Sequence, residues 1–150
     1  MPVDVTTEIV IAQPRERVAD FAVDPANAPA WYTNIHEVEW KKTPPLGVGT
    51  EVAFVARFLG RRLAYTYRVL EYIPGERLVM STAQGPFPME TTYTFESVGA
   101  DQTRMTLRNR GEPSGFAQLT APLMAAAIRR ANHKDLALLK RLLEAEPASA

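Results

Sequence analysis

A long amphipathic helix that follows an extended run of strand patterns constrains the fold of this chain more than any other feature. Residues 116–144 carry apolar side chains at helical spacing, whereas residues 36–110 alternate largely as antiparallel strands do. A twisted sheet of about six strands has a wide apolar face to bury, and one helix is only about 10 Å across. If the sheet curls round the helix and is not filled by it, a hollow remains between them, where a function would lie.

The other elements are predicted from caps, prolines and alternation. Residues 3–12 predict a first strand, and Pro14 opens a short helix. Asp24 is expected to cap a second short helix, with Pro25 at its first position. The expected order is a strand, two short helices, six strands and the long helix, which is an α+β domain. Hairpin-linked strands form an antiparallel meander, and the first strand is free to return to the opposite edge.

The strongest local signal is a hairpin centred near Gly60. A two-residue turn at Gly60-Arg61 would pair Leu59 with Arg62 and fix the register of both strands. Arginines such as Arg57 and Arg68 then fall on the outer face. The inner face collects the aromatic and apolar side chains of both strands, namely Val52, Phe54, Ala56, Phe58, Leu63, Tyr65, Tyr67 and Val69.

The long helix has an apolar stripe with a thin middle. Pro122 predicts a kink or a break near Thr120. Alanines occupy the middle of the stripe, where a filled core would carry larger side chains. Alanine is also the best helix former, so its presence has a second explanation. The stripe comprises Phe116, Leu123, Ala127, Ala131, Leu138 and Leu142.

Composition excludes several classes of function. The chain has 17 basic and 17 acidic residues and no basic stripe, so no nucleic-acid partner is expected. No apolar run is long enough to cross a bilayer and no secretory signal is visible, so a cytoplasmic location without integral membrane association is expected. Cysteine is absent, and His36 and His133 have no carboxylate at ligand spacing, so no metal site and no cofactor are expected.

Residues 1–146 are expected to form a single domain, and 147–150 a frayed tail.

Several segments spread over almost the whole chain carry a resemblance to a known family. They are Val5-Thr7-Glu8-Ile9, Pro14–Phe21, Asp24-Pro25 with Trp31, Gly49-Thr50, Glu71–Leu78 and Tyr93-Thr94-Phe95-Glu96. Together they resemble the polyketide cyclase/dehydrase and lipid transport family of the SRPBCC, or START/Bet v 1-like, superfamily. The resemblance implies a helix-grip fold, in which a seven-stranded antiparallel sheet wraps round the C-terminal helix and encloses a deep apolar cavity. The family includes lipid and sterol carriers, plant hormone binders and aromatase/cyclases, and the fold does not choose among them.

The inward-facing positions predict a set of ligand-binding residues. Tyr65 and Tyr67 are the polar members best placed to orient a ligand or, in an enzyme, to act as acid. Each is also explained by an ordinary aromatic core. Asn109 is the one amide predicted on the inner face of the last strand. The full set is Phe54, Ala56, Phe58, Tyr65, Tyr67, Met80, Met89, Thr91, Tyr93, Met105, Leu107, Asn109, Leu123, Ala127 and Ala131.

Three functions follow from this pattern. The first is binding of a lipid, a polyketide or another polycyclic or acyl molecule in the cavity, without catalysis. The second is a polyketide cyclase or dehydratase acting on a β-ketone chain, with Tyr65 or Tyr67 as catalytic residue. In the aromatase/cyclases that the chain resembles, a pocket arginine takes part, and the sequence places none inside. The third is a protein-interaction module, and a weak homodimer is left open as a partner.

Overall fold

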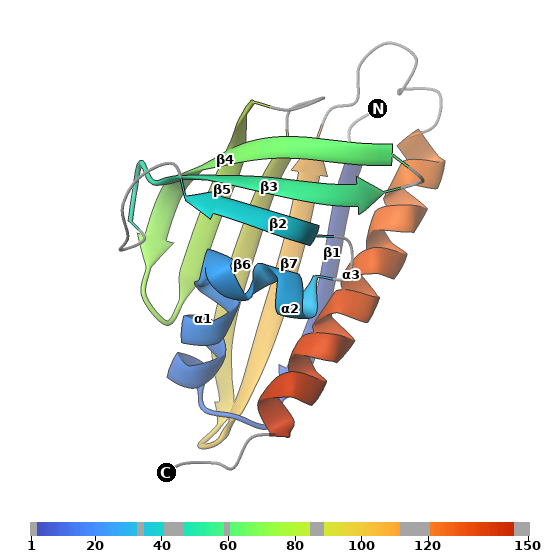
Figure 1. Ribbon diagram of the computed structural model, residues 1–150. Helices are drawn as coiled ribbons and strands as arrows, with labels where there is room; N and C mark the ends of the chain where they lie inside the picture. Colours follow the sequence, from blue (N-terminus) through green and yellow to red (C-terminus); the bar gives the residue numbers. More distant parts are fainter. Residues whose placement is uncertain are drawn as a thin grey trace.

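The computed structural model describes residues 3–32, 35–40, 47–58, 61–84, 89–111 and 121–145, and the elements follow in the expected order (Figure 1). Within these ranges it describes all side chains except those of His36, Trp40, Ala56, Phe58, Arg61, Leu63, Ala83, Gln84 and Ala121. The elements are β1 (Val3–Ile11), α1 (Arg15–Val23), the 3₁₀ turn η1 (Pro25–Asn27), α2 (Ala28–Trp31), β2 (Ile35–Trp40), β3 (Glu51–Phe58), β4 (Arg61–Ile73), β5 (Arg77–Gln84), β6 (Met89–Gly99), β7 (Gln102–Gly111) and α3 (Ala121–Glu144).

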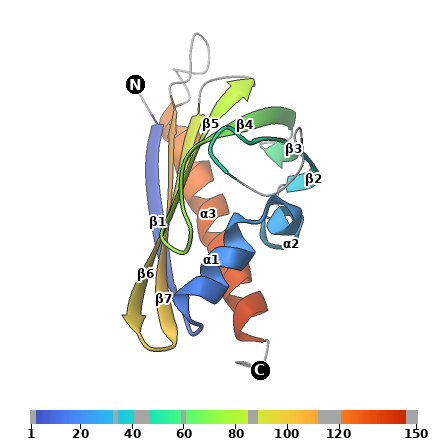
Figure 2. The same ribbon diagram turned by 90° about the vertical axis from the view of Figure 1, so that its left-hand side faces the viewer.

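The strands form one seven-stranded antiparallel sheet in the order β1-β7-β6-β5-β4-β3-β2. The first strand therefore returns to the far edge and pairs with the last, a return that the expected order of elements allowed. In Figure 1, β2 and β3 run across the view while β6 and β7 run nearly upright, so the sheet is strongly bent. Figure 2 shows all the helices on the concave side of that bend. The predicted α+β helix-grip architecture is confirmed.

Local signals position the short helices and the turns. The Asp24 carboxylate accepts a hydrogen bond from the Ala26 N–H at 3.0 Å, and Pro25 takes the first position, so the predicted cap is confirmed. Gly75 has a φ of 77°, which allows the tight turn between β4 and β5. Trp31, at the end of α2, has no exposed surface and anchors the short helices to the core.

The β3–β4 hairpin differs from the prediction by two residues. The structure pairs Phe58 with Arg61 and Phe54 with Tyr65, so the predicted turn at Gly60-Arg61 is wrong. Arg61 belongs to the strand, and the two residues between the paired ends lie outside the described part of the chain. A shift of two residues returns each side chain to the same face of a pleated strand. The inner-face assignment therefore survives the error in register.

The buried face of α3 also differs from the predicted stripe. Residues 116–120 lie outside the described part, and the helix begins at Ala121 with Pro122 in its first turn. Four buried side chains each follow a predicted position by one residue, which is a rotation of about 100°. They are Ile128, Asn132, Leu139 and Leu143, and Asp135 and Leu136 are buried with them. The prediction selected apolar residues only, so it missed a face that contains a buried amide and a buried carboxyl.

Candidate functional site

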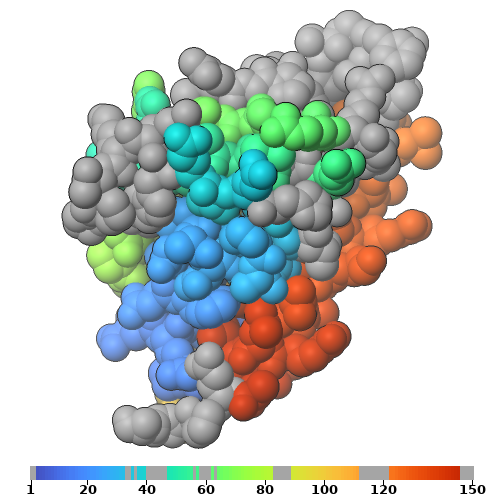
Figure 3. All heavy atoms as spheres, in the orientation of Figure 1, coloured from blue at the N-terminus to red at the C-terminus, as the bar shows by residue number. Residues whose placement is uncertain are grey.

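One end of the concave side is closed. Here α1 and the second half of α3 pack on the sheet, and Leu107, Met105 and Leu139 have no exposed surface. The space-filling view shows the short helices in blue meeting the end of α3 in red over this region (Figure 3). The core is therefore filled at this end, and Met105 and Leu107 belong to it. They were predicted to line a cavity, and the close packing of α1 and α3 prevents that.

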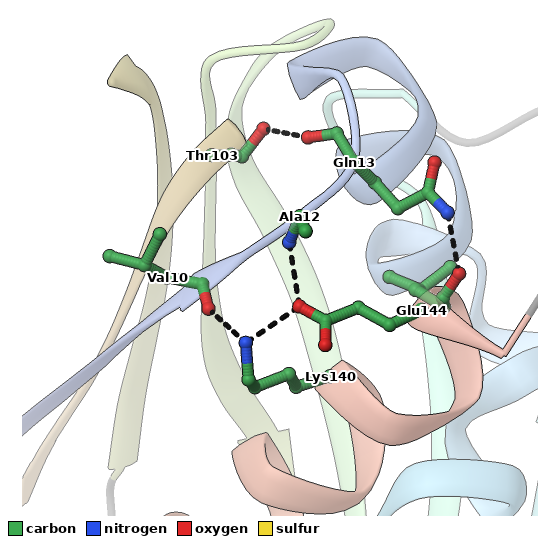
Figure 4. A network of polar contacts seen from close by, with 7 residues as sticks. Val10, Ala12, Gln13, Thr103, Lys140 and Glu144 are labelled. Atoms are coloured by element: carbon green, nitrogen blue, oxygen red, sulfur yellow. Dashed lines mark hydrogen bonds and ion pairs between the residues drawn. The ribbon is translucent and has the colours of Figure 1, made fainter. Parts of the chain in front are cut away.

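Polar contacts fasten the end of α3 to the last residues of β1 and the segment that follows it (Figure 4). The Glu144 carboxylate accepts the Ala12 N–H at 2.7 Å, and the Lys140 ammonium donates to the Val10 carbonyl at 2.9 Å. The Gln13 amide donates to the Leu143 carbonyl at 2.7 Å. These bonds fix the C-terminal half of the helix against the sheet edge.

The other end of the concave side is less filled. Tyr67 faces inward, since it lies opposite buried Val52, yet its side chain stays partly exposed. The same combination of inward position and partial exposure holds for Tyr65 and Asn109 on the sheet, and Ala131 on α3 is also partly exposed. The aromatic rings contact one another, with ring centroids 5.8 Å apart for Phe54 and Tyr67 and 6.0 Å apart for Tyr65 and Tyr67. This half of the concave face is the candidate site.

A buried pair of phenols lies between the two ends. The Tyr32 hydroxyl, at the end of α2, shares a hydrogen bond of 2.6 Å with the Tyr93 hydroxyl on β6. Burial raises the pKa of Tyr32 well above its ordinary value, and Tyr93 and the Asp135 carboxylate add to the rise. Burial also raises the pKa of Tyr93, against the opposing effect of its bond with Tyr32. Both phenols are therefore protonated at neutral pH, and since one of them donates to the other, one O–H of the pair is left to donate elsewhere.

A second polar group lies on the partly open half. The Thr91 hydroxyl donates to the Asn109 amide oxygen at 2.8 Å, across the β6–β7 pair. Burial raises the pKa of Tyr67 to about 12, and the Thr91 hydroxyl beside it acts in the opposite direction. The site thus combines aromatic surface with uncharged hydrogen-bonding groups, a composition that suits an apolar molecule bearing a few oxygens.

Positive charge lies on the other side of the sheet. The Arg68 guanidinium pairs with Glu51 at 2.6 Å, and that of Arg108 pairs with Asp4 at 2.7 Å, in both cases between solvent-exposed side chains. The prediction that these arginines lie on the outer face is confirmed. The described residues contain no group of three or more His, Asp or Glu placed to hold a metal ion. None of the described helices is long and apolar enough to span a membrane.

The predicted site residues divide into four groups. Leu123 is 73% exposed, so its inclusion was wrong, because the helix turns its side chain away from the sheet. The side chains of Ala56 and Phe58 lie outside the described part. Inward and buried are Phe54, Met80, Thr91, Tyr93, Met105 and Leu107. Partly exposed are Tyr65, Tyr67, Met89, Asn109, Ala127 and Ala131.

Three residues of this interior were not predicted. Tyr32 was missed because nothing local indicates that it meets Tyr93. Asn132 and Asp135 were missed although they are 4% and 2% exposed. Their spacing from Ile128 and Leu139 places them on the face that those residues share, and that spacing was the available signal.

The model of one protein family, described as polyketide cyclase/dehydrase and lipid transport, matches residues 2–144. The chain belongs to this family. No curated protein matches its sequence.

Solved structures of the superfamily share the fold. A protein of Thermus thermophilus is 23% identical, with a TM-score of 0.82 over 96% of this chain and 99% of that one. The Zhui aromatase/cyclase of a Streptomyces species is 16% identical, with a TM-score of 0.80 over 96% and 94% of the two chains. A START superfamily protein of Mycobacterium smegmatis is 15% identical, with a TM-score of 0.70 over 95% and 94%. As in these relatives, the polyketide cyclase/dehydrase family member described here has a START-like fold.

Proposed function

We propose that this protein binds a hydrophobic small molecule between the inner face of β3 and β4 and the first half of α3. The observation that carries the proposal is the contrast between the two ends of the concave side. Inward-facing Tyr65 and Tyr67 keep exposed surface, as does Ala131 at the edge of the buried face of α3, whereas Leu107 and Leu139 at the other end keep none. An apolar molecule that covered this surface would gain about 25 cal/mol for each Å² buried. A lipid, a polyketide or another polycyclic or acyl compound fits this chemistry.

A bulky residue on the facing side of α3 tests the proposal. Ala131 lies at the partly buried edge of the helix face. Ala131→Trp is expected to weaken binding of the apolar fluorescent probe N-phenyl-1-naphthylamine by about tenfold or more, because the indole occupies space that the probe needs. Probe fluorescence gives the affinity, and circular dichroism checks the fold.

Ala126→Trp is the matched control, because Ala126 is exposed on the same helix. Its probe affinity should equal that of the unaltered protein. A folded Ala131→Trp variant with undiminished affinity would contradict binding at this place.

A second candidate function is a polyketide cyclase or dehydratase, supported by protonated phenols inside a fold similar to that of an aromatase/cyclase. Tyr67, partly exposed and next to Thr91, is the candidate acid.

Tyr67→Phe should reduce turnover of a β-ketone chain at least tenfold, since general acids contribute about 10²- to 10⁴-fold. Product formation is followed by chromatography. Tyr72→Phe, on the same strand but opposite Leu78 and without the Thr91 hydroxyl beside it, is the control. Full turnover by Tyr67→Phe would dismiss the role.

The remaining expectations stay predictions. They are a cytoplasmic location, a weak homodimer and the protein-interaction module. The described outer face carries paired charges such as Arg68 with Glu51 and Arg110 with Glu90, which does not favour an apolar docking surface there.

A further inference from the structure

Asn132 is a buried amide without a hydrogen bond to any described residue. It lies on the buried face of α3 and is 4% exposed, and its amide nitrogen is fully buried. Folded proteins pair nearly all such groups, because a buried donor without an acceptor loses its bonds to water and gains nothing. A single unpaired amide of this kind needs an explanation.

Two other side-chain amides among the described residues donate hydrogen bonds. The Asn27 amide nitrogen donates to the Phe21 carbonyl at 3.2 Å, and that of Gln13 donates to the Leu143 carbonyl. Both bonds join neighbouring segments of the fold. Asn132 makes no such link between described residues.

Contacts along α3 show which part of the sheet Asn132 covers. Ile128, one turn earlier, packs against Val3 and Val5, and Lys140, two turns later, bonds the Val10 carbonyl. The helix therefore runs along β1, and Asn132 covers the stretch between Val5 and Val10.

The strand next to that stretch carries a second amide. Asn109 on β7 pairs with Val5 on β1, and its side chain is partly exposed on the inner face. Its oxygen accepts from Thr91, so its nitrogen remains a donor without a described acceptor. Helix and sheet thus each bring an amide to the same stretch of the interior, next to the partly open half of the concave side.

We propose that the Asn132 amide, assisted by Asn109, selects ligands that carry an uncharged oxygen acceptor, such as a ketone or quinone carbonyl. This inference rests on the proposed binding function and adds a chemical class to it. An amide offers a neutral donor, which matches a carbonyl without requiring a counter-charge in the apolar interior. A ligand oxygen that accepts from Asn132 removes the free-energy cost of the unpaired donor. A ligand of the same shape that lacks this oxygen therefore binds less well.

Two probes of nearly equal shape test the selection. 9-Fluorenone carries one carbonyl and fluorene carries none. Their dissociation constants are measured by calorimetry with the unaltered protein, with Asn132→Leu and with Asn27→Leu. Removing Asn132 should lower the preference for fluorenone about threefold to tenfold, the value of one neutral hydrogen bond. Asn27→Leu, which removes a structural amide elsewhere, should leave the preference unchanged.

The outcomes separate the inference from the proposed function. If neither probe binds the unaltered protein, the proposed function fails. If both bind and Asn132→Leu keeps the full preference, the function stands and the role of Asn132 is overturned. The Tm of Asn132→Leu should equal or exceed that of the unaltered protein, since an unpaired buried amide is replaced by an apolar side chain of similar size.

A second measurement covers the case in which Asn132→Leu does not fold. In the unaltered protein, the assigned side-chain NH₂ signal of Asn132 in ¹⁵N NMR should shift with fluorenone and much less with fluorene. Equal shifts with the two probes, or none with either bound, would overturn the inference.

Discussion

Between pH 10 and pH 12 this protein is expected to unfold cooperatively, because burial raises the pKa of Tyr32, Tyr67 and Tyr93. Near pH 10 the unfolded chain begins to release phenolic protons that the folded chain retains, so stability falls as the pH rises further. Tyr67 alone, raised from 10.0 to about 12, removes about 3 kcal/mol over this range. Tyr32 and Tyr93 act in the same direction, and domains of this kind have only about 5–15 kcal/mol in total.

Absorbance of tyrosinate and far-ultraviolet circular dichroism, recorded on the same samples, check this expectation. The chain has five tyrosines, and the two outside this buried group, Tyr65 and Tyr72, have smaller rises in pKa. As the pH rises, the tyrosinate absorbance of Tyr65 and Tyr72 should therefore appear first. The absorbance of Tyr32, Tyr67 and Tyr93 should appear at higher pH, together with the loss of the dichroism signal on unfolding. Ionisation of all five near pH 10 with the dichroism unchanged would contradict the buried arrangement.

Leu139→Ala is expected to destabilise the protein by about 3 kcal/mol, the middle of the range for a leucine removed from a filled core. Leu139 has no exposed surface and lies in the main core cluster. The free energy of unfolding is measured with urea and compared with that of the unaltered protein.

Leu123→Ala is the control on the same helix. Its side chain is 73% exposed, so a change of no more than about 0.5 kcal/mol is expected. The stripe predicted from the sequence included Leu123 and omitted Leu139. It would therefore make Leu123→Ala the more destabilising of the two substitutions. Similar losses from the two variants would therefore contradict the helix rotation seen in the structure.

The sequence predicted the faces of the strands better than their register. Alternation repeats every two residues, so it places Phe54 and Tyr67 on the inner face whichever of two turns joins the strands. The choice between those turns depended on the position of one glycine, Gly60, and nothing local distinguished the two registers. Caps, prolines and alternation also supplied the number of strands, one before the short helices and six after them, which the structure confirms.

The interior of the site was predictable only in part. Strand-borne members such as Tyr67 and Asn109 followed from alternation, and both lie on the inner face. The pairing of Tyr32 with Tyr93 spans 61 positions and depends on how α2 docks, which no local pattern encodes. Asn132 and Asp135 break the rule that core faces are apolar, so a search for apolar stripes passes over them.

The pairing of the first strand with the last has a consequence for how the protein is made. Val3 pairs with Gly111 and Ile11 pairs with Thr103, so the partners of β1 lie 92 to 108 positions later in the chain, and the Ala12 amide bonds to Glu144. A nascent chain emerging from the ribosome can form the β3–β4 hairpin early, but its first strand stays unpaired until synthesis is nearly complete. Long-range closure of this kind is slow, so the apolar side of β1 is open to chaperones throughout translation.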